Sequence, residues 1–375
     1  MTSGKGHATT AAALGREWFL ALSVGTCIVF LAAGPQILGS LHNAAVLVGV
    51  FAWLFGAILG SALAVVRHAD HLAAHLGEPY GTLILTLSVT AIEVMSITAI
   101  MLHGENNPAL VRDTLFAVIM IILNGMVGLS LLVGGWRHRE QHYNLQGANA
   151  YLGAIIPLAV LALVLPDYTV TTVGPSLSIH QAAALGVMSI GLYAVFLATQ
   201  TGRHRGYFTF AGGEPETTEQ EQHGGRSVLY HAAFLAAYMA PVVFLAEQLA
   251  HPVDYIIGNA HAPAMLGGMV IAILVATPEG VGAVRAALAN NLQRSTNIFL
   301  GSVLSTIGLT VPVMIAVSYV TGRPILLGLE HTSVVMLLLT LGVSVVTFAS
   351  GRTNMLQGVV HLLLFVVFVL LIFEG

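Results

Sequence analysis

Residues 80–102, YGTLILTLSVTAIEVMSITAIML, form an apolar run with one charged side chain, that of Glu93. A second run, residues 265–288, MLGGMVIAILVATPEGVGAVRAAL, carries Glu279 a little past its middle. Each run is long enough to cross the ~30 Å hydrocarbon core of a bilayer as a helix. A charge at that depth costs several kcal/mol, so both carboxylates predict a functional site inside a membrane.

The composition of the whole chain agrees with a membrane protein. Mean hydropathy is +0.86, 56% of the residues are hydrophobic and 8% are charged, whereas soluble domains carry about 25% charged residues. Strands of a membrane barrel would be about 10 residues of alternating polarity, and the apolar runs here are longer and unbroken. We therefore predict an all-α polytopic membrane protein with eleven transmembrane helices. The expected spans are residues 17–39, 44–66, 79–102, 113–135, 150–165, 179–202, 227–250, 264–289, 297–320, 327–349 and 355–373.

The basic residues support this count. Of the 13 Lys and Arg residues, all except Arg112 and Arg323 fall on the same side as the N-terminus when the eleven spans are threaded through a bilayer. Loops on the cytoplasmic side carry the excess of positive charge. We expect a cytoplasmic N-terminus, an external C-terminus and a first span that is a retained anchor. The single cysteine, Cys27, excludes a disulfide within the chain and a cysteine-based metal site.

One long polar segment divides the chain. Residues 203–226 are rich in Gly, Glu, Gln and Thr and predict a flexible cytoplasmic linker whose acids could attract cations. The expected domains are 1–43 (N-terminus and leading helix), 44–202 (first five-helix repeat), 203–226 (linker) and 227–375 (second five-helix repeat). Short similarities recur in the same order on both sides of the linker. Because five crossings reverse the starting side, the two repeats should be inverted, as in many secondary transporters.

Inversion brings Glu93 and Glu279 together near the midplane. Two facing carboxylates in a low-dielectric cavity need neutralisation, and either protons or a cation can supply it. Hard cations such as Ca²⁺ take oxygen ligands. The expected cation- and proton-binding residues are Glu93, Glu279, Thr90, Thr277, Asn124, Ser302, Ser305 and Thr306, with the two glutamates as the metal ligands.

Three further features surround this pair. Pro278 predicts a helix break that frees a carbonyl group beside Glu279. Asp70 and Glu247 are expected at the two mouths of the path, as cation-attracting vestibule groups or as plain interfacial acids. His68, His71 and His75 either sense pH, bind a transition metal or form a solvated interfacial cluster, and we favour the last.

No nucleotide-binding signal is found. The only lysine is Lys5, so no Walker lysine exists. We expect no cofactor, no nucleotide and no nucleic acid; the partners are inorganic cations, protons and the lipid bilayer, and the oligomeric state is open. Transport is then driven by an ion gradient, and the proton gradient is the natural source for two acids that exchange protons.

Three stretches resemble a known family: residues 77–94 (GEPYGTLILTLSVTAIEV), 112–135 (RDTLFAVIMIILNGMVGLSLLVGG) and 278–312 (PEGVGAVRAALANNLQRSTNIFLGSVLSTIGLTVP). They are similar to the bacterial ChaA-type calcium/cation:proton antiporters of the calcium/cation antiporter superfamily. The resemblance implies a bacterial inner-membrane protein with one plus five plus five helices that exports Ca²⁺, or Na⁺ or K⁺, against proton entry. By position, Glu93 and Glu279 match the essential acids of the family, and Glu247 resembles the acid that many members carry on the seventh helix.

One departure and two alternatives remain open. Many calcium/proton exchangers place an amide three residues before each acid, where this chain has Thr90 and Ala276. The missing amide oxygens weaken the case for a Ca²⁺ site, so monovalent cations stay an alternative substrate. A passive cation channel would use the same buried acids, but this chain contains its own two halves. An intramembrane enzyme is the third possibility, although no HExxH or paired-Asp pattern supports it.

Overall fold

The computed structural model describes residues 17–76, 80–103, 107–172, 174–209, 227–259 and 261–374. Most of the expected linker therefore lies outside the described residues. The leading helix α2 (Trp18–Leu38) is followed by a first set of five helical units and, after the linker, by a second set of five. The first set is α3 (Ala44–Leu76), α4 (Tyr80–His103), α5–η1–α6 (Leu110–Met120, Ile121–Met126, Val127–His138), α7–η2–α8 (Leu145–Ala159, Val160–Val164, Leu165–Tyr168) and α9 (Ile179–Thr201). The second is α10 (Val228–Asn259), α11 (Met265–Leu288), α12–η5–α13 (Leu292–Ser305, Thr306–Thr310, Val311–Thr321), α14 (His331–Thr347) and α15 (Met355–Glu374).

The all-α polytopic architecture is confirmed. In the described part of the chain, 10 helices are long and apolar enough to span a membrane, and the shorter apolar helix His331–Thr347 stands where the tenth span was expected. Four predicted spans have wrong bounds. The first helix of each set, α3 and α10, continues about ten residues past the predicted end, and α7–η2–α8 is longer than expected, whereas α14 is shorter. Hydropathy marks the membrane crossing of a helix but not where its hydrogen-bonded backbone ends.

The third unit of each set contains a π-turn, η1 or η5, in which the helix accommodates an extra residue. A third π-turn, η2, interrupts the fourth unit of the first set. Such turns weaken local hydrogen bonding and occur often at functional sites. The two turns η1 and η5 place irregular backbone at corresponding points of the two sets.

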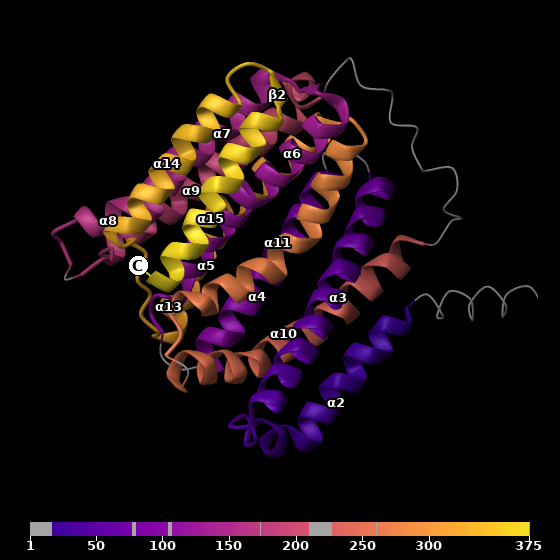
Figure 1. Cartoon of the computed structure of the whole chain (residues 1–375), viewed down its shortest axis with the longest axis vertical. Coiled ribbons are helices and arrows are strands. Elements are labelled where there is room, and N and C mark those ends of the chain that lie inside the picture. Colours follow the sequence, from indigo (N-terminus) through magenta and orange to yellow (C-terminus); the bar gives the residue numbers. More distant parts are fainter. Residues whose placement is uncertain are drawn as a thin grey trace, which may run out of the picture.

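The apolar side chains form two separate cores. The smaller core is built mainly from α2, α3 and α10, with Ile92 of α4 and Leu274 of α11 at its edge. The larger core joins α4, α5, α6, α7, α9, α11, α12, α13, α14 and α15. Figure 1 shows α2 and α3 along one side of the molecule and α14 and α15 on the opposite side, with α4 and α11 between them. The two glutamates are carried by these intermediate helices.

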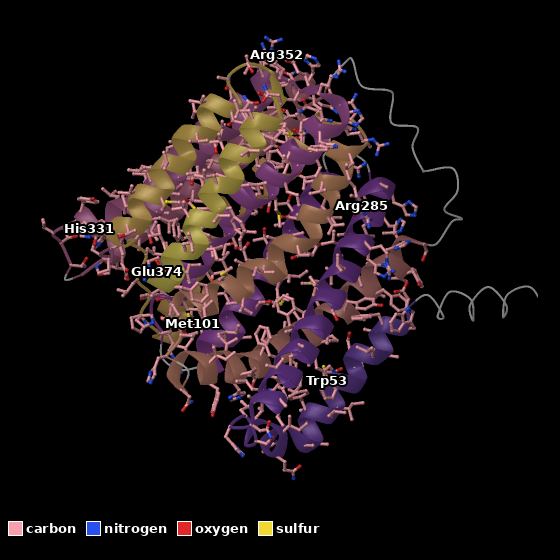
Figure 2. All side chains as sticks on the ribbon, viewed as in Figure 1. Trp53, Met101, Arg285, His331, Arg352 and Glu374 are labelled. Atoms are coloured by element: carbon pink, nitrogen blue, oxygen red, sulfur yellow. The ribbon has the colours of Figure 1, made fainter. Side chains whose placement is uncertain are left out.

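A short antiparallel pair of strands, β1 (Glu140–His142) and β2 (Arg352–Asn354), joins the two sets at one end. The all-α prediction missed it, since three residues give no periodic signal. Figure 2 shows Arg285 and Arg352 toward this end of the molecule and Met101, His331 and Glu374 toward the other. The arginines thus lie at the end that the charge pattern assigns to the cytoplasm.

Candidate cation-binding site

Glu93 lies on α4 and is almost fully buried, with 1% of its surface exposed. Its Oε2 atom accepts hydrogen bonds from the hydroxyl groups of Thr306 (3.1 Å) and Thr310 (3.0 Å). Its Oε1 atom has no hydrogen-bond partner among the described residues, and the same is true of the buried hydroxyl of Thr90, one turn earlier on α4. Buried polar atoms are normally satisfied, so these two oxygens fit a proton or a cation as their missing partner.

Glu279 lies on α11 and is partly exposed. Its Oε2 atom accepts a hydrogen bond from the hydroxyl of Ser302. Ser302 lies on the same helical unit as Thr306 and Thr310, the residues that bind Glu93. Two carboxylates that share one site repel each other, and a proton or a metal ion relieves this repulsion by neutralising their charge.

One helical unit brings the two acids together. Ser302 on α12 binds Glu279, and Thr306 and Thr310 on η5 bind Glu93. These hydroxyl groups recur every four residues, and this spacing places them along one face of a helix. The α12–η5 unit, from the second set, therefore forms a shared wall for one carboxylate of each set.

The other predicted ligands have their polar groups engaged elsewhere. Thr277 donates its hydroxyl hydrogen to the carbonyl oxygen of Ile273 at 2.5 Å, and Ser305 donates to the carbonyl oxygen of Ser302 at 2.9 Å. Asn124 hydrogen-bonds through both ends of its amide to residues of α14 and α15, as described below. Thr310 was absent from the predicted ligands; its four-residue spacing from Thr306 was the signal for it.

Pro278 does not break α11, so the predicted helix break is wrong. The helix runs without interruption from Met265 to Leu288. Proline removes one backbone donor and leaves the carbonyl group of Leu274 without its usual partner, but the packing of α11 maintains the flanking turns. Pro278 is itself buried.

Apolar residues pack beside Glu279. A small cavity beside Glu279 is lined by Ile122 and Met126 of η1, Ile298 and Phe299 of α12, and Gly280 and Ala283 of α11. A side chain added at Gly280 would approach Met126 to 2.5 Å, so η1 packs directly on the turn that carries Glu279.

The predicted vestibule acids differ in exposure. Asp70 is exposed near the end of α3 and interacts electrostatically with Arg294, at the start of α12. Glu247 is half-buried and lies well before the end of α10, because that helix extends to Asn259. The two acids therefore differ in their distance from the end of the helix that carries them.

The histidine cluster is less exposed than expected. His68 is buried with 1% of its surface exposed, and its Nδ1 atom lies 3.0 Å from Nδ1 of His231 on α10. Its Nε2 atom lies 3.3 Å from Oε2 of Glu17. His71 is half-buried, and only His75 is exposed. Interpreting all three as solvated is wrong for His68, because α10 covers it. No group of three or more His, Cys, Asp or Glu side chains within the described ranges has the geometry of a metal site.

Comparison with known proteins agrees with this architecture. The chain is 43% identical over 320 residues to a putative ionic transporter, y4hA, of Sinorhizobium fredii, with 84% of this chain and 86% of that protein covered. It is 40% identical over 319 residues to the sodium-potassium/proton antiporter ChaA of Escherichia coli, with the same coverage. A Ca²⁺/H⁺ antiporter of Bacillus subtilis is 22% identical over 346 residues, which cover 90% of this chain and 96% of that protein.

Solved structures share the fold. A structure of native YfkE matches with a TM-score of 0.75 at 20% identity and covers 95% of this chain and 100% of its own. A crystal structure of the H⁺/Ca²⁺ exchanger CAX matches with a TM-score of 0.64 at 14% identity and covers 94% of this chain and 89% of its own. The family model described as sodium/calcium exchanger protein matches residues 46–202 and 230–374, the two five-helix sets. The chain belongs to the sodium/calcium exchanger protein family and is a secondary transporter.

Proposed function

We propose that this protein exchanges a cation for protons across a bacterial inner membrane, with Glu93 and Glu279 binding both in turn. The observation that carries the proposal is the shared wall of α12 and η5, whose hydroxyl groups bind one buried carboxylate from each five-helix set. Among the described residues, one oxygen atom each of Glu93 and Thr90 has no hydrogen-bond partner, and these atoms offer the place for a cation or proton. No cofactor enters this cycle, since both transported species bind to side chains.

The cation is proposed from chemistry and from the relatives. Carboxylate and hydroxyl oxygens suit Ca²⁺, Na⁺ and K⁺, while the missing amides at Thr90 and Ala276 reduce the number of oxygen ligands below the six to eight that Ca²⁺ takes. The Escherichia coli relative is named a sodium-potassium/proton antiporter and the Bacillus subtilis relative a Ca²⁺/H⁺ antiporter. We infer that Na⁺ and K⁺ compete with Ca²⁺ for this site.

The two five-helix sets are proposed to be inverted repeats, with the start of α3 and the end of α10 on the external side. Asp70 then lies at the cytoplasmic mouth. The arginine-rich end, with Arg285 and Arg352, then faces the cytoplasm, in agreement with the excess of positive charge there.

The test is transport in proteoliposomes that contain a pH probe. Addition of Ca²⁺, Na⁺ or K⁺ on one side should move protons to that side in the wild-type protein. Glu93→Gln and Glu279→Gln should each abolish the signal, because a neutral amide cannot exchange a proton for a cation. Glu140→Gln, which alters an exposed glutamate paired with Arg352 at 3.5 Å, is the matched control and should retain transport.

Two results would contradict the proposal. Full exchange in both glutamine variants would remove the site. Cation flux that continues without any opposing proton movement would instead identify a passive channel that uses the same acids.

A further inference from the structure

A buried polar cluster lies on the far side of η1 from the two glutamates. It consists of Asn124 of η1, Thr340 and Thr347 of α14, and His361 of α15. Asn124, Thr340 and His361 have no exposed surface, and Thr347 is 3% exposed. Polar side chains buried in a membrane protein are costly unless they have a role. None of these residues hydrogen-bonds a carboxylate of the transport site in the described structure, so transport chemistry does not account for them.

The hydrogen bonds of the cluster link its four members and extend to the backbone of Leu123 and the sulfur atom of Met120. The Asn124 amide donates from Nδ2 to the Thr340 hydroxyl at 2.8 Å, and its Oδ1 lies 3.3 Å from Nδ1 of His361. Because a carbonyl oxygen only accepts, Nδ1 of His361 carries the hydrogen. Nε2 is then an acceptor, and the Thr347 hydroxyl donates to it at 2.9 Å. Thr340 in turn donates to the sulfur atom of Met120 at 3.6 Å. A neutral His361 therefore satisfies every member, and the network holds the amide of Asn124 in one orientation.

The opposite face of the same π-turn forms the wall beside Glu279. Ile122 and Met126 lie two residues before and two residues after Asn124, and residues two apart on a helix point to nearly opposite sides. Both line the cavity next to Glu279, and Met126 packs against Gly280. The orientation of η1 thus sets the position of these apolar side chains at the site.

The helices on both sides of η1 are held by close backbone contacts. A Cβ atom on Gly268 of α11 would lie 2.6 Å from the backbone nitrogen of Thr114 on α5. A Cβ atom on Gly358 of α15 would lie 2.8 Å from the carbonyl oxygen of Gly128 on α6. The segment before η1 is thereby fixed to the helix of Glu279, and the segment after it to α15. The π-turn η1 connects these two fixed segments. A change in its hydrogen-bond register would rotate the side chains of Ile122 and Met126.

We propose that His361 and Thr340 are positioning residues that hold the π-turn η1 in register through Asn124, and so keep the apolar wall of Ile122 and Met126 closed beside Glu279. The inference rests on the proposed transport role of Glu279. Loss of the network lets η1 change its register, so the wall opens at the wrong stage of the cycle. Neither residue touches the transported ion.

The first experiment separates the maximal exchange rate from the half-saturating cation concentration. Thr340→Val removes the hydroxyl group at nearly constant volume, and His361→Leu removes both ring nitrogens. We expect each to lower the maximal rate about fivefold, a change of about 1 kcal/mol, with the half-saturating concentration within about twofold of wild type. Thr340→Ser keeps the hydroxyl and should retain the wild-type rate. Ser344→Ala is the matched control, because it removes a buried hydroxyl that donates within α14 to the carbonyl oxygen of Thr340 at 2.7 Å.

A double-mutant cycle tests the route through Asn124. If His361 acts through the amide, adding His361→Leu to Asn124→Ala should change the rate no further. Additive losses, or a loss in Thr340→Ser equal to that in Thr340→Val, would overturn the proposal. So would wild-type kinetics in correctly folded Thr340→Val and His361→Leu.

A labelling experiment reports on the wall without any transport. Cys27 is the only cysteine, so Met126→Cys in a Cys27→Ser background carries a single thiol at the wall. A water-soluble maleimide should react with it about fivefold faster when Thr340→Val is added, since the wall opens more often. Equal rates would overturn the positioning role even if exchange is normal. Absence of exchange in the wild-type protein would instead contradict the proposed function and leave the labelling result standing on its own.

Discussion

At the scale of single residues, a charge inside an apolar run predicts that a residue has a function, but the sequence does not give the direction in which its side chain points. Glu93 and Glu279 were identified because nothing else of their kind occurs inside those two spans. The sequence places Asn124 on the helix that follows Glu93 and so predicts it as a ligand of the same site. In the structure its amide hydrogen-bonds Thr340 and approaches His361. A sequence indicates which helix carries a polar group, but the face it presents depends on helix rotation, and here a π-turn alters that rotation.

Thr310 provides the test of the wall at this scale. Its hydroxyl donates to Glu93 at 3.0 Å in a buried environment. Hydrogen bonds to charged groups contribute about 1.5–3 kcal/mol, so Thr310→Val should raise the half-saturating cation concentration about tenfold or more in the proteoliposome assay. Thr321→Val is the control, because Thr321 is exposed and bonds the carbonyl oxygen of Val317 on its own helix. Equal affinity in the two variants would show that Thr310 does not shape the site.

At the scale of elements, the leading helix α2 is fixed by a buried carboxylate at its start. Glu17 precedes the first turn and accepts hydrogen bonds from Arg67 at 2.6 Å and from the hydroxyls of Tyr230 and Tyr238 at 3.0 Å each. These partners come from α3 and α10, so one side chain joins three helices. Sequence analysis missed it, because Glu17 lies at the edge of an apolar run, where an acid is unremarkable.

The Glu17 network predicts a pH dependence of stability. Burial alone would raise the pKa of Glu17, but the charge of Arg67, the hydroxyl of Tyr230 and His68 outweigh it and hold the pKa below its ordinary value of 4.5. A carboxyl group with a lower pKa in the folded state stabilises the protein above the unfolded pKa and loses that contribution as the pH falls. In detergent, the wild-type protein should therefore lose stability as the pH falls below 4.5 and through the lower pKa of the folded state.

Glu17→Gln should lose about 1 kcal/mol of unfolding free energy at pH 7 and show a flatter pH dependence. The expected loss is at the low end because the Arg67 side chain is 47% exposed and solvent screens its charge. Thermal unfolding at several pH values measures this, with Glu140→Gln as the surface control. Parallel curves for wild type and Glu17→Gln would contradict the assignment.

At the scale of the whole molecule, hydropathy predicts the number and order of the helices, but it does not predict which helices pack against one another. The eleven apolar runs and the linker predict two sets of five, which the helix order matches. The division into a core of α2, α3 and α10 and a larger core of the other helices was not predicted, since it unites helices from both sets. Contacts between distant helices depend on small residues whose partners a single sequence does not identify.

Glycine contacts between helices therefore allow a test of the whole arrangement. A Cβ atom on Gly358 would lie 2.5 Å from the backbone nitrogen of Leu132, and neither backbone can move aside without separating α15 from α6. Overpacking of this kind costs about 1–3 kcal/mol, so Gly358→Ala should unfold at a clearly lower temperature in detergent. Gly342→Ala is the matched control on α14, where nothing lies within 4 Å of the added atom; alanine there should be neutral or stabilising by about 0.5 kcal/mol. If Gly358→Ala proved as stable as Gly342→Ala, α15 would not pack on α6 as the structure shows. The segment after η1 would then not be fixed to α15.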